Sequence, residues 1–228
     1  MSVEEIIDSL KKLANLGNIN GMARFGINSD GTLGVSMPDV RQIAKSLKKN
    51  HVLALELWDT GIHEAKILAA LIDDWKLVTD SQTEKWVIEF DSWDVCDQVC
   101  MNLFDKLPFA YAKAFQWAGR DEEFVRRAGF VLMASMAVHN KKAPDGYFEP
   151  FLEVIAEYST DERNFVRKAV NWALRQIGKR NRYLNQKAIE TAEKISETKD
   201  SKAARWIAAD ALRELRSDGV KRRIAGKK

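Results

Sequence analysis

One stretch of the sequence brings an acidic and an aromatic side chain onto the same face of an expected helix. In DSWDVCD, residues 91–97, Trp93 and Asp97 are four residues apart, so a helix places them side by side. Asp91 and Asp94 are expected to be the N-cap and N3 residues of this helix, whereas Asp97 lies too far along to cap it. A carboxylate beside an aromatic ring suits the stabilisation of a cationic sugar, although this spacing alone is a weak signal.

A second stretch combines a tryptophan with a run of cations. Residues 163–182 contain seven lysines and arginines and no acidic residue. Helical spacing places four side chains in one sector opposite the apolar stripe, namely Lys168, Trp172, Arg175 and Lys179. Such a surface attracts anions, although any single lysine or arginine can equally be an ordinary solvated side chain.

The elements that position these residues follow from a repeated apolar stripe with the spacing i, i+3, i+4, i+7, i+8, i+11. It occurs in residues 166–177, 41 residues earlier in 125–136 and 38 residues later in 204–215, while residues 67–75 fit most of it. This period predicts an all-α, HEAT-like helical-repeat solenoid, an α-α superhelix with a concave basic face. We expect a single domain over 1–228, whose basic tail from about 218 to 228 either adds nonspecific attraction or is disordered.

The same repeat register aligns further cations. Arg127 and Lys66 occupy the position of Lys168 in their own repeats. Cations spaced by one helix pair suit a phosphate backbone, because each neutralised phosphate releases counterions. The predicted DNA-binding residues are Lys66, Lys168, Arg175, Lys179 and Arg180.

Composition limits the other classes of function. The chain has 228 residues, 46% of them hydrophobic, and a net charge of only +3, so attraction to nucleic acid must come from local clustering. The longest apolar run, residues 128–138, is too short to span a bilayer, and we expect a cytoplasmic monomer with no membrane partner. Cys96 and Cys100 are expected to be buried free thiols, and the three histidines lack metal-ligand spacing, so no metal and no cofactor are predicted.

With these residues in view, the chain resembles the DNA alkylation repair enzyme family, the HEAT-like-repeat alkylpurine DNA glycosylases, from about residue 26 to 215. The motifs that carry the resemblance are GVSMPDVRQIAK (34–45), HE (63–64), DSWDVCD (91–97), EEFVRRA (122–128) and NFVRKAVNWALRQIGKRN (164–181). The essential residues of the family fall on Asp97, Trp93, Arg127 and Trp172, and Arg175 matches a further DNA-contacting position. An aromatic residue that some members carry in their N-terminal helices has no counterpart around Gly21 and Met22.

The resemblance implies hydrolysis of the N-glycosidic bond of cationic alkylated purines, such as 7-methylguanine and 3-methyladenine, in duplex DNA. Asp97 would stabilise positive charge on the deoxyribose, Trp93 and Trp172 would pack against the sugar and backbone, and Arg127 would hold a phosphate. The family is expected to work on an open concave face, and the sequence offers no candidate for a pocket that encloses a flipped base.

Two other functions stay open at this point. The first is a non-catalytic HEAT-like protein that binds damaged or branched DNA, which needs the basic residues but not Asp97. The second is a HEAT protein-interaction adaptor, which predicts no affinity for DNA.

Overall fold

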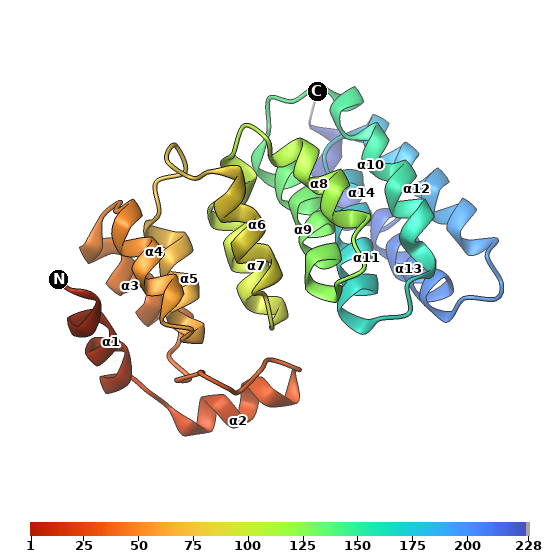
Figure 1. Cartoon of the computed structure of the whole chain (residues 1–228). Coiled ribbons are helices and arrows are strands. Elements are labelled where there is room, and N and C mark those ends of the chain that lie inside the picture. Colours follow the sequence, from red (N-terminus) through yellow and green to blue (C-terminus); the bar gives the residue numbers. More distant parts are fainter. Residues whose placement is uncertain (227–228) are drawn as a thin grey trace. The chain divides into compact units, whose positions relative to one another are not determined.

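The computed structural model describes residues 1–226, and this range folds into α-helices joined by short turns, with no β-strand (Figure 1). The all-α prediction is therefore confirmed. The contacts of the chain group into two compact units, residues 1–108 and the residues from 109 onward. The expectation of one domain stays a prediction, and each unit is described by itself.

The first unit is organised around one buried helix. Helix α5 packs against α3, α4 and α7, and of its ten residues only Leu71 is not buried. Because α5 contacts neighbours on several sides, even its polar side chains are drawn into the interior. The helices of this unit are α1 (Val3–Lys12), α2 (Leu16–Arg24), α3 (Met37–Leu47), α4 (His51–Asp59), α5 (His63–Ile72), α6 (Asp80–Ile88) and α7 (Trp93–Asn102).

Two of the helix boundaries in this unit bear on the sequence predictions. Ser36 caps α3, its hydroxyl accepting a hydrogen bond from the Asp39 backbone amide, as the sequence indicates. Helix α5 ends at Ile72, and the backbone of Asp73 is extended. The buried Asp73 carboxylate accepts hydrogen bonds from the side chains of His51 and Gln82, each at 2.7 Å, which holds the chain in this position. Trp75, which the periodic stripe assigned to this helix, therefore lies beyond its end and is 38% exposed.

The second unit consists of helix pairs in two layers. Within it, α9, α11 and α13 pack in sequence against one another, while α10 contacts both α8 and α12. This is the stacking expected of HEAT-like repeats. The helices are α8 (Ala110–Ala118), α9 (Glu123–His139), α10 (Glu149–Glu157), α11 (Asn164–Gly178), α12 (Arg182–Ser196), α13 (Lys202–Leu215) and α14 (Asp218–Ala225).

The repeated apolar stripe forms the core of this second unit. All six stripe residues of α11 and of α9 are buried, and five of the six are buried in α13, where Leu212 is half-buried. Gly129 lies in the α9 stripe, and a Cβ there would stand 2.4 Å from the Ala118 backbone nitrogen. Helices α8 and α9 therefore approach backbone to backbone, which only glycine allows at this position.

The basic tail is ordered over most of its length. Residues 218–225 form α14, which buries Val220 and Ile224, so the alternative of a disordered tail is wrong for this stretch. Lys227 and Lys228, which the tail prediction includes, lie outside the described residues. None of the helices described is long and apolar enough to cross a membrane.

Candidate DNA-binding and catalytic site

The predicted site residues divide between the two units. Trp93, Asp97 and Lys66 belong to the first unit, whereas Arg127, Lys168 and the other predicted residues belong to the second. The geometry of each group is therefore described within its own unit.

Helix α7 carries the acidic and aromatic pair. It begins at Trp93 with Ser92 as its N-cap, so the prediction of Asp91 as the cap is wrong by one residue. The Ser92 hydroxyl accepts from the Asn28 amide at 2.9 Å, and Asp91 accepts from the Asn28 side chain at 2.9 Å. The acid and the serine thus tie the loop around residue 28 to the start of α7.

The exposed face of α7 presents Trp93 and Asp97. Both side chains are half-buried, while Cys96 and Cys100 are completely buried beside them. Burial raises the pKa of the Cys100 thiol well above its usual range, and the neighbouring Cys96 adds to this rise. The two thiols are therefore core residues, as predicted, and not nucleophiles. Trp93 is held in place by its indole N–H, which donates to the Phe25 carbonyl at 3.1 Å.

Next to Trp93, Asp94 forms a hydrogen bond with the buried His63. The His63 Nε2 donates to Asp94 Oδ2 at 2.8 Å, and the His63 side chain is 3% exposed. Burial by itself lowers the pKa of His63, but the hydrogen bond that it donates to Asp94 and the charges of Asp94, Glu64 and Asp91 outweigh this effect and raise the pKa. The other oxygen of Asp94, Oδ1, is buried without a hydrogen-bond partner.

This pair gives a prediction about protonation. Asp94→Asn is expected to bring the pKa of His63 below its ordinary value of 6.5, because burial then dominates. A raised pKa stabilises the fold below the unfolded value and loses this stabilisation as the pH rises through the folded pKa. An NMR titration of the imidazole signals measures both variants, and Asp91→Asn, which removes a weaker influence, serves as the control. A pKa of His63 unchanged in Asp94→Asn contradicts the assignment.

The first unit also contains a cavity that the sequence did not indicate. It measures about 650 Å³ and lies against α2, α5, α7 and the connection from Ile27 to Met37. Its apolar lining comes mainly from Met22, Phe25, Ile27, Val35, Met37, Ile67 and Trp93, and its polar lining includes His63, Glu64, Asp94 and Gln98. No periodic pattern could have revealed it, because α2 buries none of its own residues. A hydrogen bond from the Asn18 side chain to the Gly34 carbonyl, at 2.9 Å, ties α2 to the connection that follows it.

A buried carboxylate fixes one wall of this cavity. Glu64 is 1% exposed, and its two oxygens accept hydrogen bonds from the backbone amides of Leu33, Gly34 and Val35 at 2.9, 2.7 and 3.0 Å. Gly34 has a φ of +75°, and a Cβ there would stand 2.2 Å from the Asn15 carbonyl oxygen. The loop before α3 is therefore held in one conformation against the start of α2.

Lys66 does not join an exposed row of cations, which corrects the sequence prediction. It is 9% exposed, its ammonium donates to the Glu89 carbonyl at 3.1 Å, and it lies 5.4 Å from the centre of the Trp58 ring. The repeat register assumed an α5 with one solvated face, whereas α5 is covered on nearly all sides.

In the second unit, Arg127 is directed into the protein. It is 5% exposed, and its Nη1 donates to the Phe165 carbonyl at 2.6 Å, which links α9 to the first turn of α11. A guanidinium has five N–H donors, so the bond to the Phe165 carbonyl uses only part of the hydrogen-bonding capacity of Arg127.

Helix α11 presents the predicted basic and aromatic face. Lys168 is exposed and Trp172 is half-buried, both on the side opposite the buried stripe. Among the described residues, Lys168 has no ion-pair partner and no hydrogen-bond partner. Of the predicted DNA-binding cations, Lys168 is therefore the one best placed to contact a phosphate of the DNA backbone.

The remaining predicted cations of α11 have partners within the second unit, which corrects the idea of an uncompensated basic stripe. Glu214 of α13 pairs with both Arg175 and Lys179, the latter at 2.6 Å, and Asp210 lies 3.7 Å from Arg175. Burial raises the pKa of Glu214, but the hydrogen bonds from Lys179 and Arg175 outweigh it and lower the pKa. The acids are 35 to 39 residues further along the chain, so they fall outside the basic segment.

Arg180 is also a structural residue in this unit. Its Nη1 donates to the Ala137 carbonyl at 2.7 Å, and its guanidinium lies 4.0 Å from the centre of the Phe148 ring. Burial lowers the pKa of Arg180. The guanidinium holds the end of α9 in place, so the prediction of Arg180 as a DNA contact is not favoured by this geometry.

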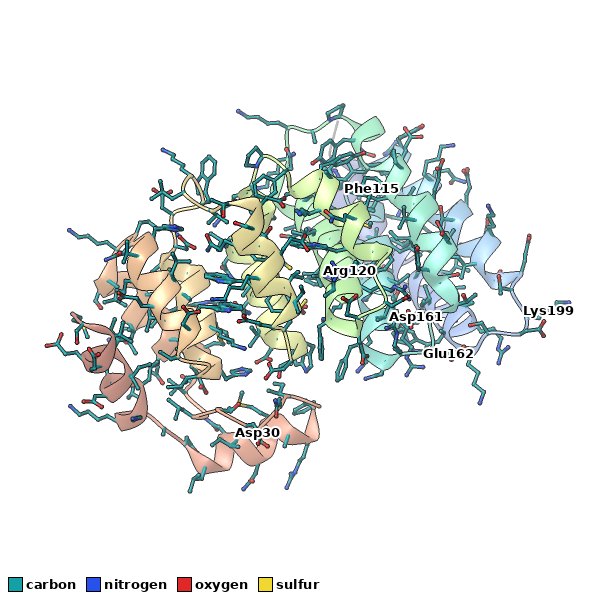
Figure 2. All side chains as sticks on the ribbon, in the orientation of Figure 1. Asp30, Phe115, Arg120, Asp161, Glu162 and Lys199 are labelled. Atoms are coloured by element: carbon teal, nitrogen blue, oxygen red, sulfur yellow. The ribbon has the colours of Figure 1, made fainter. Side chains whose placement is uncertain are left out.

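The turn before α11 carries two acids that connect it to neighbouring repeats (Figure 2). Asp161 accepts hydrogen bonds from Arg126 at 2.8 Å and from Arg163 at 2.5 Å, and Glu162 accepts from the Ser201 hydroxyl at 2.8 Å and the Ala203 amide at 3.0 Å. These contacts join α9, α11 and α13, which positions the exposed face of α11.

One aromatic residue of this surface was missed in the sequence. Trp206 of α13 is 39% exposed, and the Arg167 guanidinium lies 5.3 Å from its ring centre. It lies 38 residues after Lys168, at the equivalent position of the next repeat. The repeat register carries this signal, because it aligns Trp206 with Lys168.

Comparison with known proteins adds three findings. The sequence model of the family described as "DNA alkylation repair enzyme" matches residues 6–215. Two uncharacterized proteins, from Listeria innocua and Listeria monocytogenes, are each 24% identical to this chain over 199 residues, which is 86% of this chain and 87% of theirs. A solved structure described as "a new family of proteins related to the HEAT-like repeat DNA glycosylases with affinity for branched DNA structures" superimposes with a TM-score of 0.77 at 20% identity, covering 94% of this chain and 96% of that one.

The solved structure establishes the fold. Its superposition over nearly the whole of both chains identifies the helix pairs as HEAT-like repeats, as the 40-residue period predicts.

Proposed function

Because the chain belongs to the DNA alkylation repair enzyme family, we propose that it is a monofunctional DNA glycosylase that hydrolyses the N-glycosidic bond of cationic alkylated purines in duplex DNA. The observation that carries this proposal is the partly exposed Asp97 on the same face of α7 as Trp93. A carboxylate that was sealed in the core, like that of Asp73, would be unable to reach a sugar.

The reaction needs electrostatic help mainly at the sugar. Alkylation at N7 of guanine or N3 of adenine makes the base a cation, so it departs without being protonated. Positive charge then develops on the deoxyribose, as in glycoside hydrolysis, and the Asp97 carboxylate stabilises it and orients the attacking water. Trp93 supplies an aromatic face that attracts the same charge, and Trp172 belongs to the DNA-binding surface proposed for α11 of the second unit.

Binding of the DNA backbone falls to the second unit in this proposal. Lys168 contributes an exposed charge to the duplex, whereas Arg127 is 5% exposed and supports this surface by holding the Phe165 carbonyl in the first turn of α11. Trp206 and Arg167 extend the surface of α11 onto α13. Arg175 and Lys179 contribute less, because Glu214 already neutralises them.

The proposal is tested with purified protein and a duplex that contains 7-methylguanine. We expect release of the free base, followed by strand breakage only after alkaline treatment, because a hydrolytic enzyme leaves the abasic sugar in place. Breakage without alkali would indicate a lyase mechanism, and absence of any released base would remove the glycosylase assignment.

A non-catalytic DNA-binding function is the second candidate, because the superimposed protein of known structure is described as having affinity for branched DNA. This function requires the basic surface but not Asp97. Tight binding to a four-way junction together with no base release from alkylated duplex selects it over the glycosylase.

Substitution of one exposed and one buried lysine tests which of them contributes to DNA binding. Lys168→Ala is expected to weaken binding and to reduce the slope of log affinity against log salt by about 1, the change for one lost phosphate contact. Lys66→Met, which removes the same charge from the interior of the first unit, is expected to leave the slope unchanged. Fluorescence anisotropy across a salt series measures both. Equal slopes in Lys168→Ala and the unmodified protein contradict the placement of Lys168.

A further inference from the structure

The second unit contains a cavity of its own, which we call the turn cavity, where two successive turns meet α14. Its lining comes from the connection between α9 and α10, the turn between α11 and α12, and Arg223 of α14 (Figure 1). It measures about 960 Å³, at the upper end of the range of roughly 300–1,000 Å³ that is usual for ligand sites. Asp97 and Lys168, on which the proposed function depends, do not line it.

Positive charge dominates the lining of the turn cavity. Its cations are Lys141, Lys179, Arg180 and Arg223, whereas Asp145 is the one acid among the described residues that line it. The cations come from three separate parts of the second unit, so their convergence is a property of the fold and not of one basic run of sequence. A recess of this kind attracts carboxylates or phosphates.

Two of these cations are available to a ligand. Lys141 and Arg223 are exposed, and within the described part of the chain neither side chain has an ion-pair or hydrogen-bond partner. Lys179, in contrast, pairs with Glu214, and Arg180 donates to two backbone carbonyls. The first two are therefore the side chains that a bound anion is able to recruit.

The rest of the wall is partly apolar. Val138, near the end of α9, is 39% exposed and lines the cavity together with Ala143 and Pro144. No aromatic side chain is among the described residues of the lining, so a nucleobase has no ring on which to stack. A phosphate backbone also gains nothing from an apolar wall. The combination suits a chain that carries both carboxylates and apolar side chains, which is an acidic peptide.

We propose that the turn cavity is the docking site for an acidic, partly apolar peptide segment of a partner protein. Lys141 and Arg223 pair with carboxylates of the peptide, and one of its apolar side chains packs against Val138. The inference goes beyond the proposed function and does not depend on it, because none of these three residues is assigned a part in base release. Lys168 and Trp172 lie outside the cavity, so a docked peptide leaves both accessible to DNA.

Adjacent residues provide a matched control for the test. Lys142 and Arg222 are exposed, and neither lines the cavity, although each is next in sequence to a residue that does. The test variant combines Lys141→Glu with Arg223→Glu, and the control variant combines Lys142→Glu with Arg222→Glu. Both change the net charge by the same amount at exposed positions, so a difference between them reports position and not overall charge.

The probe is a fluorescein-labelled hexapeptide in which every third residue is leucine and the others are aspartate or glutamate. Fluorescence anisotropy with the full chain measures its binding at about 0.15 M salt, which screens distant charges. We expect the control variant to bind the peptide as the unmodified protein does. The test variant is expected to lose affinity by about tenfold or more, because carboxylates then face carboxylates. A peptide with serine in place of leucine is expected to bind more weakly.

Four results overturn the proposal. The first is no binding of the acidic peptide by the unmodified protein, and the second is an equal loss in the test and control variants, which indicates nonspecific attraction. The third is equal affinity for the serine peptide, since the apolar contact is what distinguishes a peptide from other polyanions. The fourth is tighter binding of hexathymidylate than of the peptide, abolished in the test variant, which makes the turn cavity a nucleic-acid site.

Discussion

Asp97→Asn is expected to reduce the rate of 7-methylguanine release by about 100-fold or more, the usual loss when one pre-organised electrostatic partner of a transition state is removed. Asparagine keeps the size of the side chain and one acceptor oxygen but loses the negative charge. The charge is what stabilises a cationic sugar, so the loss is expected in the chemical step and not in DNA binding. Single-turnover kinetics with saturating enzyme measure that step.

Asp91→Asn is the matched control for this experiment. It makes the same chemical change at an exposed residue of the same segment, where the carboxylate accepts a hydrogen bond from the Asn28 side chain. We expect it to retain most of the activity, and anisotropy is expected to give both variants a DNA affinity close to that of the unmodified protein. If Asp97→Asn released the base at the unmodified rate, the role assigned to this carboxylate would be wrong.

Glu64→Ala is expected to lower the free energy of unfolding by about 3 to 5 kcal/mol, among the largest effects of a single substitution in this chain. The change removes the acceptor for three backbone amides, those of Leu33, Gly34 and Val35, and leaves them without a partner in a buried region. It also opens a void beside the cavity. Urea denaturation followed by circular dichroism measures the loss.

Two further variants locate the cause of this destabilisation. Glu64→Gln keeps one oxygen, which is able to accept from both Gly34 and Val35, so its loss is expected to be smaller, about 1 to 3 kcal/mol. Glu56→Ala removes an exposed acid of α4 and is expected to change stability by less than about 0.5 kcal/mol. Equal stability of Glu64→Ala and Glu56→Ala contradicts the anchoring role.

The local periodicity of the chain predicted its helices well. The stripe residues of α9 and α11 are buried because a helical face that is apolar must pack against another element, and this rule needs no knowledge of the partner. Ser36 was identifiable as a cap for a similar reason, since its partner is only three residues away. Asp91 was misassigned because the adjacent Ser92 takes the cap position.

Long-range partners account for most of what the sequence did not reveal. Lys66 was assigned to the surface because its contacts, Trp58 and Glu89, lie 8 residues before it and 23 residues after it. The partners of Arg175 and Lys179 lie in the next repeat. Charge within a window of sequence therefore overestimates the free charge on the folded surface.

The cavity beneath α2 was unpredictable for a different reason. It lies under α2, a helix that buries none of its own residues, and a sequence pattern records which residues are apolar but not where they fail to meet. An aromatic residue does lie close to Met22, since Phe25 follows three residues later as the C-cap of α2.

The ion pairs that Glu214 of α13 makes with Arg175 and Lys179 mean that the electrostatic potential of one repeat depends partly on the next repeat along the chain. Glu214 neutralises two cations of the preceding helix pair, so a chain that ended one repeat earlier would display Arg175 and Lys179 as additional positive charges, with no substitution in α11 itself. Adding or deleting a terminal repeat is therefore a means of tuning affinity for a polyanion, and the length of such an array becomes a determinant of how strongly it binds.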